Sequence, residues 1–327
     1  RILNIGADNS GEVGHYAYNS VKRAIDACAD AEIVECNLMA APGITEPSLT
    51  NHLIKTCEDR ADALAIIDLE NVTGTTPGDY IPSTEGVVFG SEADRLPNVA
   101  NTVRNMEDRL LNSSYGAAYF PWVQVRDDNS NRLLWVPPSV VALGTMASSQ
   151  NKSELWFAPA GFTRGGLTEG AAGIPVIGVR EKLTSKQRDE LYEAGINPIA
   201  SFPAEGIVIF GQKTLQMEAS ALDRVNVRRL MIYLKKEVSR MAATVLFDQN
   251  VQTTWSRFIG KVNPFLSSVK SRLGLTEYRV ILNETTTTPD LIDRNIMYAK
   301  IMLKPARAIE FIAIDFVITN SGASFDD

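Results

Sequence analysis

The segment that most restricts the fold is ALAIIDLE, residues 63–70, which is almost entirely apolar. It lies between a helical pattern at 48–58 and a loop rich in glycine and proline. A short strand that is apolar on both faces is typical of a sheet covered by helices on both sides. Further strands are predicted at 1–7 and 32–36, and further helices at 16–28 and 97–112. This alternation predicts an open α/β sheet domain over residues 1–198.

Residues 71–93 are rich in Gly, Pro and Thr and carry no regular apolar pattern. A connection of this length is unusual inside a compact domain, where most connections are a few residues long. We therefore expect 71–93 to be a variable loop on the outside of the molecule.

The stretch AYFPWVQVRDDNSNRLLWVPPSVVALGTMA, residues 118–147, holds two of the four tryptophans. A strand is predicted at 117–125, then a polar turn and a second extended piece, and a helix that begins at Pro137 and Pro138. Proline favours the first turn of a helix because its missing N–H is not needed there. We expect Trp122 and Trp135 to be buried between sheet and helix, where large rings would stiffen the domain.

The pattern changes near residue 199, which predicts a second, α+β domain over 199–327. A β-hairpin is predicted at its start, with a turn at 203–206. Two long amphipathic helices follow, at 222–247 and 251–273, and Pro264 should kink or interrupt the second. Long strands are predicted near the end of the chain at 277–284, 295–306 and 308–319. The fold class is thus an open α/β sheet domain followed by a domain with two long helices and a sheet of a hairpin and long strands.

Charge is unevenly distributed along the chain. The whole chain has a net charge of −7, residues 1–199 have −10, and residues 200–327 have +3. Residues 224–272 hold ten basic and two acidic side chains. Such asymmetry is typical of a surface that meets an acidic partner, either a protein or a nucleic acid. Two ordinary helices with solvated basic faces would give the same pattern. The acidic chain carries no recognised nucleic-acid motif, and a protein partner with an acidic surface fits the run as well as nucleic acid does. The predicted partners include no nucleic acid.

Few residues suit catalysis, a metal or a cofactor. The three cysteines lack C-x-x-C spacing and there are only two histidines, which disfavours a zinc site and histidine-based catalysis. The glycines at 6–14 follow a predicted strand and precede a helix, an arrangement that can hold a phosphate. Their spacing does not match a dinucleotide or P-loop motif. A nucleotide-dependent α/β enzyme that uses loop 6–14 remains an alternative, but the prediction is no enzyme and no cofactor. The chain has no apolar run of about 18 residues, so no membrane insertion is expected.

Several blocks of sequence, in order, resemble the tail sheath proteins of contractile-tailed bacteriophages. The blocks are YFPWVQVRDDNSNRLLWVPPSVVALGTMA (119–147), ELWFAPAG (154–161), LYEAGINPIASFPAEGIVIFGQKTL (191–215), DRVNVRRLMIYLKKEV (223–238), NETTTTPDLIDRN (283–295) and KPARAIEFIAIDF (304–316). The resemblance covers about residues 110–320. Residues 1–110 resemble that family's first domain in their α/β pattern.

The resemblance implies a mechanical role in a virion. Sheath subunits stack as six-fold rings around a tail tube, are held extended, and contract to drive the tube through the host envelope for genome ejection. Expected partners are further copies of the chain, the tail tube protein, and baseplate and tail terminator proteins, with assembly in the host cytoplasm. Family members link neighbours by exchanging terminal strands, and this chain is expected to be a fragment that lacks those arms. The alternative is that the chain belongs to the sheath of a phage-tail-like bacteriocin or of a secretion system.

The resemblance also places the C-terminal domain innermost, with one helix against the tube. By position that helix is 251–273. Arg257, Lys261, Lys270 and Arg272 are therefore the tube-contact candidates, with Lys270 pointing away from the other three. The tube surface opposite them should be acidic.

Overall fold

The apolar segment at 63–70 forms strand β2 (Leu64–Asp68), in which all five residues are buried. It lies in a five-stranded sheet of order β1-β2-β3-β7-β8. The first four strands run parallel, and β8 pairs antiparallel with β7. The other strands of this sheet are β1 (Leu38–Ala40), β3 (Gly116–Phe120), β7 (Ile196–Phe202) and β8 (Gly206–Ile209). The prediction of a parallel sheet between helices is confirmed, and the computed structural model describes residues 16–69, 99–127 and 131–310.

Helices cover both faces of this sheet because side chains along a strand point alternately to its two sides. Ala65 and Ile67 contribute to one core, and Leu64 and Ile66 to the other. The first core is closed by α1 (Tyr16–Ala27), α2 (Pro47–Arg60), α4 (Val99–Asp108) and α7 (Ser185–Glu193). The second is closed by α5 (Pro138–Lys152) and the start of α8 (Val225–Ala243). A four-residue helix, α6 (Gly161–Arg164), lies beside β8.

The segment 117–125 was predicted as one strand, and this prediction is wrong. It forms the end of β3 and then β4 (Val123–Arg126), and the two strands belong to different sheets. Pro121 lies between them and has no N–H to donate to a neighbouring strand, so the ladder ends there. Strand β4 lies in the middle of a three-stranded antiparallel sheet, between β5 (Leu133–Val136) and β6 (Val176–Val179).

Helix α5 begins where its prolines predict. Pro137 is the N-cap residue and Pro138 the first helical residue, so the helix has no side-chain cap of its own. Asp68, at the end of β2, supplies the missing acceptor: its carboxylate accepts from Ser139 N at 2.9 Å and from Ser139 Oγ at 2.7 Å. It also accepts from Gly43 N at 2.9 Å. One buried carboxylate thus joins the sheet to the start of α5 and to the loop before α2.

The hairpin β7–β8 corrects the predicted boundary between residues 198 and 199. That boundary falls inside β7, which pairs through Ala118–Phe120 with β3. The hairpin therefore completes the five-stranded sheet, and it is not the beginning of the C-terminal domain. A segment rich in apolar residues can continue a sheet across a change in sequence character, so composition alone misplaced the boundary.

A second correction concerns residues 32–36, which were predicted as a strand. They form a turn in which the Asp30 carboxylate accepts from Glu32 N and the Asp30 carbonyl accepts from Val34 N. A side chain that bonds its own local backbone competes with strand formation. The edge strand is instead the shorter β1, a few residues later.

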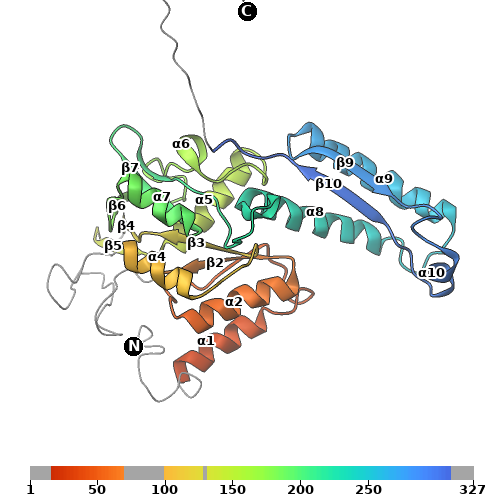
Figure 1. The fold of residues 1–327 in the computed structure, drawn as a ribbon, viewed down its shortest axis with the longest axis horizontal. Helices are drawn as coiled ribbons and strands as arrows, with labels where there is room; N and C mark the ends of the chain where they lie inside the picture. The colour runs from red at the N-terminus through yellow and green to blue at the C-terminus, as the bar shows by residue number, and fades with distance from the viewer. Residues whose placement is uncertain (1–15, 70–98, 128–130, 311–327) are drawn as a thin grey trace, which may run out of the picture.

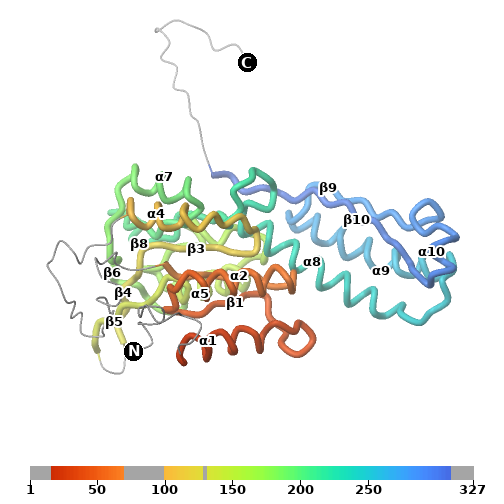
Figure 2. The backbone as a smooth tube through the Cα atoms, turned by 60° about the horizontal axis from the view of Figure 1, so that its bottom comes forward, coloured from red at the N-terminus to blue at the C-terminus, as the bar shows by residue number. Residues whose placement is uncertain are grey.

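The rest of the chain forms an elongated lobe that projects from the α/β unit (Figure 1 and Figure 2). We call residues 16–223 the α/β unit and residues 235–305 the lobe. The short 3₁₀ helix η3 (Ala221–Asp223) precedes α8. The lobe contains the second half of α8, α9 (Gln252–Ser271), β9 (Leu275–Ile281), α10 (Pro289–Asp293) and β10 (Lys300–Pro305). Strands β9 and β10 pair antiparallel as a two-stranded sheet that packs on α9.

The core of the lobe is separate from the two cores of the sheet. It is built around Trp255, Phe258, Val262 and Leu266 of α9 and includes Trp156 from the α/β unit. Helix α9 continues through Pro264, so the predicted interruption is wrong. Residues 306–310 follow β10 and contain no strand, and residues 311–319 of the last predicted strand lie outside the described part of the chain.

Candidate functional site

Helix α8 connects the α/β unit to the lobe (Figure 1 and Figure 2). Its buried residues all lie in the first half: Val225, Asn226, Val227, Arg228, Arg229, Leu230, Ile232 and Leu234. The helix therefore leaves the α/β unit near Leu234 and continues into the lobe. Because the lobe is attached through α8, a rotation of α8 relative to the α/β unit would displace the lobe. We call the contacts between α8 and the α/β unit the joint.

Two buried arginines fix the first half of α8. The Arg228 guanidinium lies 4.0 Å from the centre of the Tyr115 ring and also donates to Ser114 Oγ. Arg229 donates to Gln150 Oε1 at 3.2 Å and is 4% exposed. Burial lowers the pKa of both guanidinium groups, that of Arg229 to about 10. Because a buried cation is tolerated only beside its partners, rotation of α8 about its axis would be costly.

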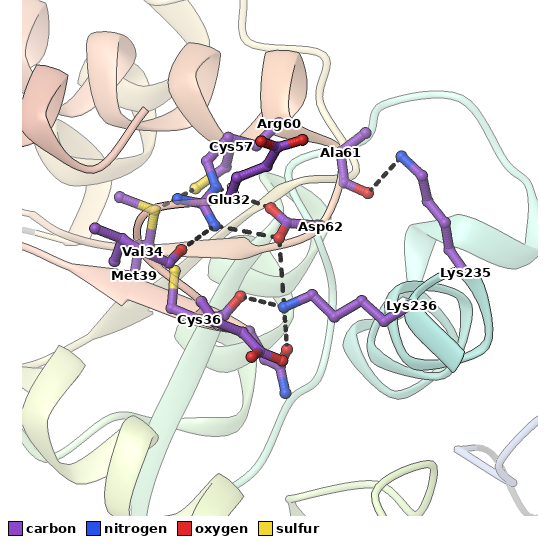
Figure 3. A network of polar contacts seen from close by, with 12 residues as sticks. Glu32, Val34, Cys36, Met39, Cys57, Arg60, Ala61, Asp62, Lys235 and Lys236 are labelled. Atoms are coloured by element: carbon purple, nitrogen blue, oxygen red, sulfur yellow. Dashed lines mark hydrogen bonds and ion pairs between the residues drawn. The ribbon is translucent and has the colours of Figure 1, made fainter. Parts of the chain in front are cut away.

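A second set of contacts lies where α8 leaves the unit (Figure 3). Arg60, at the end of α2, donates through Nε and Nη2 to the two oxygens of Asp62, at 2.8 Å and 3.1 Å. Lys236 Nζ lies 3.3 Å from Asp62 Oδ2. The same ammonium donates to Cys36 O and to Asn37 Oδ1, each at 2.6 Å. The Asp62 carboxylate thus links α2 to α8, and the Lys236 ammonium links α8 to the loop before β1.

This ion cluster is largely shielded from water. The side chains of Arg60, Asp62 and Lys236 are 1%, 11% and 14% exposed. Burial opposes ionisation of Asp62, but the hydrogen bond from Arg60 and the charges of Lys236 and Arg60 outweigh it, so the pKa of Asp62 is lowered. The two-pronged contact with Arg60 adds geometric specificity to the charge attraction. This cluster is therefore expected to hold the joint more strongly than an exposed ion pair would.

Exposed contacts surround the cluster and add less. Lys235 Nζ donates to Ala61 O at 3.1 Å from an exposed position. Arg240 pairs with Glu35 of the unit and with Glu237 of its own helix. Ion pairs in water contribute at most about 1 kcal/mol each, because solvent screens them.

Two of the cysteines near this cluster, Cys36 and Cys57, are held in the unreactive thiol form. Burial raises the pKa of Cys57 to about 12 and also raises the pKa of Cys36, so both thiols stay protonated. The Cys57 sulfur lies 3.6 Å from the Met39 sulfur in the core. In the parts of the chain that the structure describes, no three His, Cys, Asp or Glu side chains come together in a way that could hold a metal ion.

The four tube-contact candidates are all exposed, but they do not form one set. Arg257 pairs with Asp248 at 2.6 Å, and Lys261 donates to Thr244 Oγ1 at 2.7 Å. Arg272 pairs with Glu154 of the α/β unit at 2.9 Å and lies 5.0 Å from the centre of the Trp156 ring. Lys270 forms no ion pair with a described residue. Lys261 thus contacts the C-cap residue of α8, Arg257 contacts the loop after α8, and Arg272 contacts the segment after α5.

The two tryptophans of residues 118–147 have different surroundings. Trp122 is 4% exposed, and its indole N–H donates to Leu69 O at 3.1 Å. Trp135 is only partly buried, outside the core clusters, and Arg180 covers its ring at 5.2 Å. Pro138 is buried and Pro137 partly buried at the start of α5. The stiffening role of these residues remains a prediction.

The residues of the joint were not found from the sequence. Arg228, Arg229 and Lys236 belong to the basic run that was expected to face an acidic partner. Six of the ten basic side chains of that run instead contact carboxylate or backbone carbonyl groups of the same chain: Arg224, Lys235, Lys236, Arg240, Arg257 and Arg272. The only local signal was the oppositely charged pair Arg60 and Asp62, which lies just after the helix predicted at 48–58.

Two family models match consecutive parts of the chain. The model described as "Phage tail sheath protein central domain" matches residues 19–215, and "Phage tail sheath C-terminal domain" matches 218–319. This chain belongs to the phage tail sheath family. The family is one of structural proteins and not of enzymes, which confirms both the resemblance and the prediction of a non-enzymatic role. The two sheath models meet near residue 216, after the hairpin and before α8.

Curated sheath proteins of phages give the same assignment. The tail sheath protein of Enterobacteria phage T4 is 32% identical over 335 residues, which cover 99% of this chain and 48% of that protein. The tail sheath protein of Vibrio phage KVP40 is 38% identical over 199 residues, which cover 61% of this chain and 29% of that protein. This sheath chain therefore spans about half the length, or less, of the curated relatives it matches.

Solved structures with a similar fold come from contractile assemblies. One is the anti-feeding prophage helical sheath in the contracted state, with a TM-score of 0.65 and 21% identity over 95% of this chain and 75% of that one. Another is the PVC sheath complex of an extracellular contractile injection system in the contracted state, with a TM-score of 0.65 and 22% identity over 88% of this chain and 72% of that one. At these identities the likeness shows a shared sheath fold.

Two predictions concern residues that the structure does not describe. The glycine-rich loop 6–14 and the expected outer loop 71–93 both lie outside residues 16–69, 99–127 and 131–310. Among the described helices of this sheath chain, none has the length and the apolar character needed to cross a membrane.

Proposed function

We propose that this chain is the central and C-terminal part of a subunit of a contractile phage tail sheath. In this proposal the subunits polymerise as stacked six-fold rings around a tail tube and contract to drive the tube through the host envelope. The proposal is supported by the family and by one feature of the lobe, the open two-stranded sheet. It places the protein in the virion tail, assembled in the host cytoplasm, with baseplate and tail terminator proteins at the two ends.

The sheet of β9 and β10 is unusual because a folded domain seldom contains a sheet of two strands alone. Two strands alone are marginally stable in water, and sheets normally need a third strand or a covering helix. Helix α9 covers one face, while residues along β10 alternate between exposed and half-buried. Among the described residues, no third strand pairs with either edge of this sheet. Open edges accept strands from other chains through main-chain hydrogen bonds.

This edge supports linkage of copies by exchanged strands, as the family resemblance suggested. Main-chain bonds hold such a contact while the rigid parts of neighbouring subunits rotate. The α/β unit and the joint described above supply that rigidity. A subunit of this kind can change its place in a lattice without changing its own fold.

The test is assembly of the full-length protein. The purified protein should form helical tubes with six-fold symmetry, visible by electron microscopy, at low salt and moderate concentration. A truncation that removes the chain beyond residue 310 should remain monomeric under the same conditions. Full-length protein that stays monomeric at every concentration and salt tested would contradict the proposal.

We also propose that α9 faces an acidic tube surface, with Arg257, Lys261, Lys270 and Arg272 as contacts. Lys261 and Lys270 are the probes, because Arg257 and Arg272 already form ion pairs within this chain. Lys270 points away from the other three and so tests a different side of α9. Lys270→Glu and Lys261→Glu in the full-length protein should each reduce co-assembly with the tube protein, and more strongly at low salt. Lys300→Glu on β10 is the matched control. Unchanged co-assembly of the Lys261 and Lys270 double variant would exclude this contact.

The identity of the assembly is part of the proposal. A phage tail is favoured because the sheath relatives at 28% identity or more come from phages, whereas the extracellular injection systems match at 21–22%. A phage-tail-like bacteriocin or a secretion sheath is the alternative. Electron microscopy of particles from the source culture distinguishes them, because a phage carries a capsid on its tail.

A further inference from the structure

The chain after β10 returns from the lobe to the α/β unit and is attached there by one side chain. Glu310 accepts three hydrogen bonds through its carboxylate. Arg224 Nε donates to Oε1 at 2.6 Å, Gln212 Nε2 donates to Oε1 at 3.2 Å, and Tyr192 Oη donates to Oε2 at 2.9 Å. We call this group the Glu310 clasp.

The three donors of the clasp come from three different segments, two in the α/β unit and one at the start of α8. Tyr192 belongs to α7, Gln212 follows β8, and Arg224 is the N-cap residue of α8. Gln212 is 4% exposed, and the Arg224 and Glu310 side chains are 24% and 17% exposed. Burial and the nearby Glu310 charge raise the pKa of the Tyr192 hydroxyl, which therefore remains a donor. The carboxylate is held by rigid and partly shielded groups, which makes charge-assisted bonds effective.

The residues between the lobe and the clasp form a bridge with few contacts. Ala306 N donates to Gly274 O at 3.1 Å, which ties the beginning of the bridge to the lobe. Arg307, Ala308 and Ile309 are exposed, and Ile309 is 83% exposed. Beneath them lies a groove of about 660 Å³ lined in part by Trp156, Phe157 and Phe210. The bridge therefore spans the groove without filling it, and the clasp is its attachment to the unit.

We propose that Glu310 is a positioning residue that fixes the point from which the chain beyond it leaves the subunit. This inference rests on the proposed function, in which terminal segments link neighbouring copies. Without the clasp, the chain would be free from Ala306 onward, and five residues can span about 17 Å. The start of the linking segment would then sample a sphere of that radius. Fixing it raises the effective concentration of the segment at the neighbour's sheet edge, because less chain entropy is lost on binding.

The clasp itself is tested by limited proteolysis with trypsin in the full-length protein. Arg307 is exposed, but a protease needs several residues of freely moving chain, so the clasp should protect the bond between Arg307 and Ala308. Glu310→Ala should increase the rate of cleavage at Arg307 by about tenfold, as expected for loss of charge-assisted bonds. Tyr192→Phe removes one donor and should increase it by a smaller factor. Glu284→Ala, an exposed glutamate in the lobe, is the matched control and should leave the rate unchanged.

The release of the fragment that ends at Arg307 is followed by mass spectrometry, and thermal melting checks that each variant is folded. If Glu310→Ala and Tyr192→Phe are both cleaved at the rate of the original protein, the clasp does not hold the chain and the inference is wrong. This result is independent of whether sheaths form.

The positioning role is tested by assembly kinetics. If full-length protein forms tubes, Glu310→Ala should form them at least several-fold more slowly, measured by light scattering, and Glu284→Ala at the original rate. Equal rates for Glu310→Ala and the original protein would overturn the positioning role and leave the proposed function intact. Failure of the original protein to assemble would contradict the proposed function, while the cleavage experiment still decides whether the clasp exists.

Discussion

The α/β unit and the lobe differ in how completely they bury their sheets. In the unit, a five-stranded sheet is covered on both faces, and every residue of β2 and β3 is buried. In the described part of the lobe, a two-stranded sheet packs on α9, and β10 alternates between exposed and half-buried residues. The sheet of the unit is covered on both faces, whereas among the described residues the lobe leaves the edges of its sheet unpaired and part of its apolar surface exposed.

This difference suggests a division of labour within one sheath subunit. A parallel sheet with two cores resists deformation, because close-packed interiors transmit strain and are not easily compressed. An open edge is needed where chains must join, and it would be a liability elsewhere. In the proposed sheath, the joint at α8 would transmit a displacement of the lobe to the α/β unit.

The largest expected difference between the two regions concerns large aromatic side chains. Phe120 is fully buried at the end of β3, so Phe120→Ala should lower the free energy of unfolding by about 3–5 kcal/mol. Phe265 on α9 is only partly buried, and Phe265→Ala should cost about 1–2 kcal/mol. Urea unfolding followed by circular dichroism measures both. Equal losses would show that the lobe is packed as tightly as the unit.

Replacing a helical glycine with alanine should change the stability of the two regions in opposite directions. A Cβ added to Gly144 in α5 would lie 2.1 Å from the carbonyl oxygen of Ala172, so the helix is packed backbone to backbone at this point. Gly144→Ala should therefore destabilise the protein by about 2–3 kcal/mol. Gly260 in α9 has open space around it, and Gly260→Ala should stabilise the lobe by about 0.5–1 kcal/mol. Thermal melting of both variants should show shifts in opposite directions. A shift in the same direction would mean that α9 is not free on that face.

A substitution in the joint should lower the free energy of unfolding by less than the core substitutions in the α/β unit above. Lys236→Met removes the contacts with Asp62, Cys36 O and Asn37, and leaves polar groups without a partner, so it should cost about 1–2 kcal/mol. Lys235→Met, one residue earlier on an exposed site, should change stability by no more than about 0.5 kcal/mol. Hydrogen exchange in α8 and in the loop before β1 would locate the loss. An equal change in the free energy of unfolding for the two variants would mean that the ion cluster does not stabilise the joint.

Much of the fold could be predicted because local rules and the tertiary structure agree. Strand β2 is a single apolar run, α5 begins at its prolines, and α7 has a capping box at Thr184 and ends before Gly195 in the left-handed region. In each case the residues that decide the element are adjacent in sequence. Helix α9 passes through Pro264, because its apolar face is held by the core of the lobe, which no local rule includes.

The joint could not be predicted because its partners are far apart in sequence. Lys236 contacts Cys36, which is 200 residues away, and the sequence offers no way to match one lysine of a basic run to one carbonyl. The run at 224–272 was expected to meet an acidic partner, which stays a prediction, and the sequence could not show that Asp62, Glu35 and Glu154 of the same chain contact it. Charge patterns predict the chemistry of a partner and not its location.

The smallest expected effect is the response of the joint to acid. The folded state lowers the pKa of Asp62 below its unfolded value of about 3.9. The ionised carboxylate therefore stabilises the folded state fully above that unfolded value, and this contribution is lost as the pH falls through the folded pKa. The stability gap between the original protein and Asp62→Asn should be constant from pH 7 to pH 5 and should narrow below about pH 4. Urea unfolding at each pH measures the gap. A gap that stays constant down to pH 3 would mean that Arg60 and Lys236 do not favour the ionised form, and the joint would then depend on the packing of α8 alone.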